Sequence, residues 1–170
     1  MGLALAFVAA LSGVESAFPS QQDPSLAELV RAACVDTGLR RELVERTARD
    51  NQWNTARITR QTGEQGWSLA YRVGDATIMV SGIPSAGAVD PSLASLCAVS
   101  ITNPASNWMT GVEQLGLDMG LAAEPTGKLE GPIEMHVWSK PAAWTLTAVY
   151  HPSNRTVAVT LSRQVVTSSQ

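Results

Sequence analysis

Apolar residues recur at helical spacing in two consecutive stretches near the start of the chain, residues 25–38 and 39–50. In the first, Ser25 and Glu28 fit a capping box, because Ser25 can accept from a free backbone N–H while Glu28 reaches back. Gly38 can end that helix in the left-handed conformation. The apolar stripes are Leu26, Leu29, Val30, Ala33 and Cys34, then Leu39, Leu43, Val44, Thr47 and Ala48. We therefore predict an N-terminal helical hairpin.

Apolar and polar residues then alternate, which predicts strands. Residues 67–82 fit a hairpin that turns at Gly74-Asp75, because glycine in the first position suits a type II′ turn. Pairing Val73 with Ala76 places the apolar residues of both strands on one face. Residues 144–162 form a second hairpin around Pro152-Ser153-Asn154, and a loop of two or four residues gives the same faces.

Three more elements are expected between these hairpins or beside them. One is a strand at 97–102, and another is a helix at 103–116 with Asn103 as its cap and Gly116 past its end. The third is a strand at 133–140. Its inward residues are expected to be Ile133, Met135 and Val137, and its outward residues Glu134, His136, Trp138 and Lys140.

The order of these elements predicts an α+β fold. We expect an antiparallel sheet of about five to six strands. One face of this sheet should be packed by the N-terminal helical hairpin and the mid-chain helix.

The first residues, "MGLALAFVAALSGVESAF", form an apolar run followed by small residues. This pattern is typical of a secretory signal peptide, and the apolar run is too short to span a bilayer as a helix. We expect a signal peptide at 1–17 and a single domain at 18–170. The mature protein would then be periplasmic or extracellular, with no membrane span after signal removal.

The chain has only two cysteines, Cys34 and Cys97. Cys34 lies on the apolar stripe of the first helix and Cys97 begins an apolar strand, so both should point toward one core. In an oxidising compartment such a pair should form a disulfide. Two buried free thiols and a functional cysteine are the alternatives. A metal site is not expected, because neither cysteine has a Cys or His neighbour at ligand spacing.

The formal net charge of −3 argues against a nucleic-acid or anionic-membrane partner. Seven of the twelve basic residues lie between Arg31 and Arg60, interleaved with acidic ones, as on a solvated helix surface. The segments "GIPSAG" and "GLAAEPTGKL" fit neither a nucleophile elbow nor a phosphate-binding loop. No cofactor is expected.

Two sets of residues remain as candidates for function. Trp138, His136 and Arg72 are expected on the outer, Ser/Thr-rich face of the sheet, as a contact patch for a ligand or protein partner. Alternatively, another element covers Trp138, since indoles usually bury. His136 with Glu134 nearby could instead form a general acid–base pair.

The chain resembles small exported bacterial proteins of unknown function. The resemblance lies in a helix bearing "ACVDTG", a charged second helix ending near a tryptophan, and a second cysteine before a mid-chain strand. It implies export and carries no activity to transfer.

We expect a non-catalytic binding or accessory module whose partner is an unknown protein or small ligand in the cell envelope. One alternative is a hydrolase-like enzyme that uses His136 and Glu134. The other is an inhibitor that presents the loop 82–91.

Overall fold

The computed structural model describes residues 24–56, 66–82, 93–125, 132–141 and 143–163. The expected signal peptide and its boundary with the mature domain lie outside these residues, as does nearly all of the loop 82–91. The helices are α1 (Leu26–Val30), which continues into a π-helical turn η1 (Arg31–Val35), α2 (Arg41–Asp50) and α3 (Trp108–Asp118). The strands are β1 (Asn54–Thr55), β2 (Trp67–Val73), β3 (Ala76–Gly82), β4 (Leu96–Thr102), β5 (Ala122–Ala123), β6 (Glu134–Lys140), β7 (Trp144–His151) and β8 (Thr156–Arg163).

The strands form one antiparallel sheet in the order β1-β2-β3-β4-β8-β7-β6-β5. The expected α+β class with an antiparallel sheet is confirmed, but the described part of the sheet has eight strands rather than five to six. The two extra strands, β1 and β5, lie at the edges and have only two residues each. Such short strands show no alternation in the sequence.

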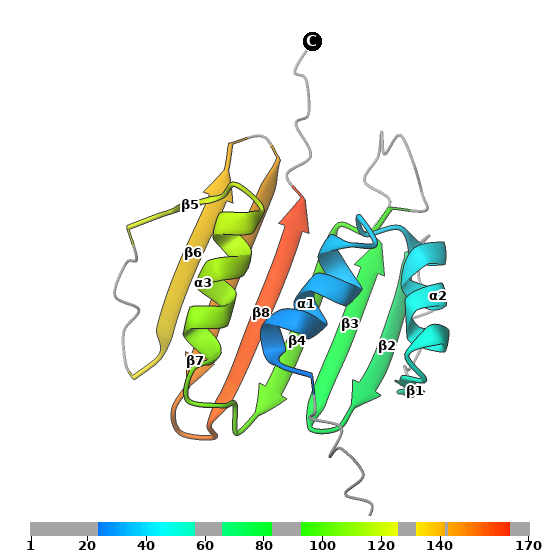
Figure 1. Ribbon diagram of the computed structural model, residues 1–170, viewed down its shortest axis with the longest axis horizontal. Helices are drawn as coiled ribbons and strands as arrows, with labels where there is room; N and C mark the ends of the chain where they lie inside the picture. The colour runs from blue at the N-terminus through cyan, green and yellow to red at the C-terminus, as the bar shows by residue number, and fades with distance from the viewer. Residues whose placement is uncertain (1–23, 57–65, 83–92, 126–131, 142, 164–170) are drawn as a thin grey trace, which may run out of the picture.

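The three helices and the π-helical turn lie on the same face of the sheet, with α3 over β6 and β7 and α2 beside β2 (Figure 1). The expected helical hairpin is wrong in its packing, because α1 contacts α3 and β4, while α2 meets the π-helical turn. Two small residues, Ala27 of α1 and Gly111 of α3, allow these helices to pack closely. A β-carbon placed on Gly111 would lie 3.2 Å from the Cβ of Ala27.

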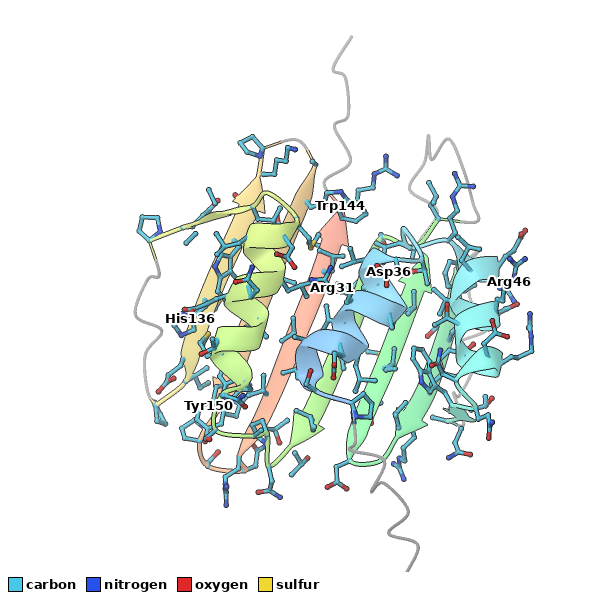
Figure 2. All side chains as sticks on the ribbon, in the orientation of Figure 1. Arg31, Asp36, Arg46, His136, Trp144 and Tyr150 are labelled. Atoms are coloured by element: carbon cyan, nitrogen blue, oxygen red, sulfur yellow. A yellow bond between two sulfur atoms is a disulfide. The ribbon has the colours of Figure 1, made fainter. Side chains whose placement is uncertain are left out.

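The local signals at the first helix are confirmed. The Ser25 backbone N–H donates to Glu28 Oε2 (2.7 Å), and the Glu28 N–H donates to Ser25 Oγ (3.3 Å), which is the predicted capping box. Gly38 has the left-handed φ of 54° that the sequence predicts for it. Arg31 then ties the π-helical turn to α3, because its guanidinium donates to Asp118. In Figure 2, Arg31 lies in the space between α1 and α3.

The predicted bounds of the mid-chain helix are wrong. Asn103 precedes the helix with a φ of 53°, and Gly116 lies inside α3, where it is buried. Gly120, with a φ of 68°, ends the helix instead. The N–H of Gly120 donates to Leu117, and the N–H of the next residue donates to Gly116, which together form a Schellman motif.

Both hairpins have the predicted register. Val73 pairs with Ala76, and the second hairpin uses the four-residue loop, so that His151 pairs with Thr156. The core lies between the sheet and the helices. Its fully buried members in the sheet are Ile78, Val80, Cys97, Val99, Leu146, Ala148, Val157 and Val159.

A disulfide joins Cys34 in the π-helical turn to Cys97 in β4, with a Cα–Cα distance of 5.7 Å. Both cysteines are fully buried, and the predicted pairing is confirmed. The bridge therefore fastens the N-terminal helical segment to the middle of the sheet.

Candidate functional site

The predicted patch does not assemble, because Trp138 lies on the face that the helices cover. Trp138 pairs with Leu146 and His136 pairs with Ala148, and residues that pair directly share a face of the sheet. Both partners are fully buried. Trp138 itself is only 5% exposed and lies under α3. The outward orientation predicted for β6 is therefore wrong: Trp138 points to the helix side of the sheet, where α3 covers it.

Arg72 lies on the other face. Its neighbour Tyr71 is buried on the helix side, so Arg72 points from β2 toward the face on which no described helix packs (Figure 1). Four strands separate β2 from β6 in the sheet, which is about 24 Å at the usual strand spacing. Arg72 and Trp138 therefore cannot contribute to one contact surface.

His136 shares the helix side with Trp138, and their rings stack with centroids 6.1 Å apart and planes 22° apart. Glu134 is exposed at the start of β6. Among the described residues, neither Glu134 nor a hydroxyl group hydrogen-bonds to His136. The structure therefore places Glu134 and His136 on one face of one strand without the contacts of a general acid–base pair.

A depression of about 340 Å³ lies at the opposite end of the sheet, between α2, β1 and β2. In Figure 2, Arg46 of α2 marks this side of the molecule, and His136 and Tyr150 lie on the far side. The lining residues are Glu45, Ala48, Arg49, Gln52, Trp53, Thr55 and Tyr71. They come from one helix, the turn after it and two paired strands, so the fold itself brings them together.

The turn after α2 shapes one wall of this depression. The Gln52 N–H donates to the carbonyl of Arg49 (3.1 Å), and the Trp53 N–H donates to that of Ala48 (2.8 Å). This is a second Schellman motif. The backbone reversal brings Trp53 back toward the sheet, where β1 begins at the next residue and pairs with β2.

Gln52 occupies the position of this motif at which glycine is usual. Its φ is 56°, a conformation that costs a residue with a side chain about 1 kcal/mol. At the corresponding position after α3 the chain has Gly120. Four described residues other than glycine have a positive φ, and of these only Gln52 lines the depression.

Trp53 and Tyr71 form the aromatic part of the depression. Their ring centroids lie 6.0 Å apart, and the ring planes are tilted by 57°. Tyr71 is 7% exposed, and burial raises the pKa of its phenol above the ordinary value, with a further increase from the charge of Glu45. The phenol therefore stays neutral and can donate a hydrogen bond.

The charges around the depression are unevenly paired. Glu45 Oε1 accepts from Arg41 Nε (3.0 Å), and the guanidinium of Arg41 also lies 5.6 Å from the ring centroid of Trp67. Arg49 lies one helical turn after Glu45, yet it forms no ion pair with any described residue. Of the described residues that line the depression, Arg49 is thus the cation that is available to pair with a ligand.

Sequence reasoning missed this site. It assigned Ala48 and Tyr71 to apolar faces but could not bring α2 beside β2, because the pairing of β1 with β2 joins residues that the chain separates. The left-handed turn at Gln52 contains no glycine that would mark it in the sequence.

The described residues contain no group of three or more His, Cys, Asp or Glu side chains that could hold a metal ion. None of the helices in this part of the chain has the length and apolar character needed to cross a membrane. Comparison of the chain with protein-family models, with curated proteins and with solved structures found no match.

Proposed function

We propose that this protein is an exported, non-catalytic binding module of the bacterial cell envelope, and that the depression beside α2 is its binding site. The observation that carries the proposal is the meeting of an aromatic pair, Trp53 and Tyr71, with Arg49, a cation that forms no ion pair with a described residue, in one depression. Ligand sites typically combine an apolar floor with a few polar groups that fix orientation.

The disulfide between Cys34 and Cys97 supports the location. Such bonds persist in oxidising compartments such as the periplasm and the extracellular space. The hydrolase alternative has less support, because His136 stacks on Trp138 and hydrogen-bonds to no carboxylate or nucleophile among the described residues.

The proposal is tested with the disulfide-bonded protein and three aromatic probes that differ in charge: benzoate, benzamide and benzylamine. Each probe is titrated while amide and indole N–H signals are followed by nuclear magnetic resonance. We expect at least one probe to shift the Trp53 signals in a saturable way, with a dissociation constant of about 1 mM, as befits so small a ligand.

The matched variants are Trp53→Ala, which should abolish the shifts of the amide signals of the other lining residues, and Trp108→Ala, which should preserve them. Trp108 is a partly buried tryptophan on α3 and contacts Tyr150 rather than the depression. The proposal is wrong if none of the three probes gives saturable shifts at the depression. It is also wrong if Trp53→Ala binds as well as Trp108→Ala.

A further inference from the structure

We infer that the depression selects a small planar carboxylate, whose anionic group binds Arg49 and whose apolar body packs on Trp53 and Tyr71; this inference rests on the proposed function. It concerns the class of ligand, which neither the aromatic pair nor the volume of the depression decides alone. The pairing of the charges decides it.

Glu45 and Arg49 have the spacing and the order along the helix that favour an ion pair, with the acidic residue one turn before the basic one. The structure instead pairs Glu45 with Arg41, which lies one turn earlier. Arg41 is also held against the face of Trp67, so it occupies Glu45 from the side away from Arg49. One oxygen of the carboxylate that could neutralise Arg49 is therefore engaged by Arg41, and no ion pair joins Glu45 to Arg49.

The other polar groups in the lining can serve an acceptor. A tyrosine hydroxyl, a glutamine amide, a tryptophan indole N–H and a threonine hydroxyl can each donate a hydrogen bond. The Tyr71 hydroxyl makes no hydrogen bond to another described residue, and it remains protonated because burial disfavours the phenolate. A carboxylate presents two acceptor oxygens to such donors and an ionised partner to the guanidinium.

The depression lies at the C-terminal end of α2, and this position is the main physical objection to an anionic ligand. The C-terminal end of a helix carries partial negative charge, which repels an anion. The Schellman motif answers this objection in part. The carbonyls of Thr47, Ala48 and Arg49 already accept backbone N–H groups from residues 51–53. These carbonyls are therefore not free to favour a cation, and the full charge of Arg49 exceeds the partial charge that remains.

The aromatic pair admits a cation as well, since rings tilted toward each other can flank an ammonium group. Such a ligand would have to share Glu45 with Arg41 and tolerate Arg49 beside it. A carboxylate ligand in turn lies near Glu45, but Arg41 offsets the charge of Glu45, so the net charge of Arg41, Glu45 and Arg49 favours an anion.

The test compares benzoate, benzamide and benzylamine on the natural protein and on two charge variants. Benzoate should bind the natural protein about fivefold more tightly than benzamide, which is what one partly exposed charge contact provides. Benzylamine should bind most weakly. Arg49→Gln should remove the preference for benzoate and leave the affinity for benzamide within about twofold.

The matched control is Arg46→Gln. Arg46 is an exposed arginine on the same helix and does not line the depression, so its loss should preserve the preference. The preference should also weaken as salt is added, since a partly exposed ion pair is screened.

The outcomes separate this inference from the proposed function. Equal affinities for the three probes, or tightest binding of benzylamine, would overturn the carboxylate class while the depression remains a binding site. A preference for benzoate that survives Arg49→Gln would overturn the role of Arg49. Failure of every probe to bind the natural protein would overturn the proposed function itself.

Discussion

Gly116 of α3 lies against the indole of Trp138 on β6. A β-carbon placed on Gly116 would lie 3.3 Å from both Cγ and Cδ1 of Trp138. The absence of a side chain on the helix therefore makes room for the largest side chain on the strand. This contact is why the tryptophan is buried and why the glycine lies within the helix rather than beyond its end.

Trp138→Ala should consequently destabilise the protein. Removing a buried indole leaves a cavity under α3 and should lower the free energy of unfolding by about 3–5 kcal/mol. Arg72→Ala, at an exposed position on the other face, should change it by no more than about 0.5 kcal/mol. Urea denaturation of the two variants measures both changes. Equal stabilities would show that Trp138 is not part of the core.

Gln52→Gly should stabilise the protein. The residue has a φ of 56° at the end of α2, and glycine adopts this conformation without the side-chain clash, which should raise the free energy of unfolding by about 1 kcal/mol. The reciprocal change, Gly120→Ala, should lower it by about 1 kcal/mol, because Gly120 has a φ of 68° at the matching position after α3. Thermal denaturation of the two variants provides the comparison.

If Gln52→Gly left stability unchanged or reduced it, the side chain would be making a stabilising contact that outweighs the strain. If the variant is more stable and binds the aromatic probes less well, the strain is retained at a cost to stability because the side chain serves the site.

Tyr71 should make stability fall at alkaline pH. Its pKa in the folded protein is above the ordinary value of about 10, chiefly because burial disfavours the phenolate. Above about pH 10 the unfolded chain loses the phenolic proton more readily than the folded protein does, so ionisation of the phenol favours unfolding. The contribution of the protonated Tyr71 to the free energy of unfolding is thus complete below about pH 10, and it is lost as the pH rises through the pKa of Tyr71 in the folded protein.

Tyr71→Phe removes this ionisation and should give a shallower decrease in the free energy of unfolding between about pH 9 and pH 11, measured by urea denaturation. Ultraviolet titration of the phenolates in the natural protein should show one tyrosine that ionises above the usual range. An identical pH dependence in Tyr71→Phe would mean that the buried phenol does not contribute.

The parts of the fold that the sequence predicts well are those in which a turn fixes the register. Gly74-Asp75 forces Val73 to pair with Ala76, and this single constraint assigns every residue of β2 and β3 to a face. The capping box of α1 works in the same way, because its partners lie within one turn of helix. In both cases the interaction that decides the structure is local.

The orientation of β6 could not be obtained in this way. Lys140 pairs with Trp144, so an odd number of residues connects β6 to β7, and this reverses the faces that a loop of two or four residues would give. The hydrophobic pattern does not correct the error, because β6 has apolar residues on both faces. Met135 and Val137 are half-buried on the open face, and Trp138 is buried on the other.

The candidate site depends on contacts that are more distant still. The sequence predicts α2 and β2 separately, but the depression exists only because β1, two residues long, pairs with β2 and draws the end of α2 beside Tyr71. No periodic pattern can be read from two residues. Whether Arg49 has an ion pair with a described residue likewise depends on which of two arginines, Arg41 or Arg49, Glu45 contacts.

Removal of the disulfide should destabilise the protein more than any single surface substitution. The bond joins residues separated by 63 positions, and closing such a loop restricts the unfolded chain by roughly 4 kcal/mol in the chain-entropy model. Urea denaturation of the double variant Cys34→Ala, Cys97→Ala should therefore show a loss of about 3–5 kcal/mol in the free energy of unfolding. The single variant Cys34→Ala is the control, because it also lacks the bridge and should lose nearly as much. Should the double variant lose no more than about 1 kcal/mol, the bond would not restrain the unfolded chain, and the attachment of the N-terminal helix to β4 would depend on packing alone.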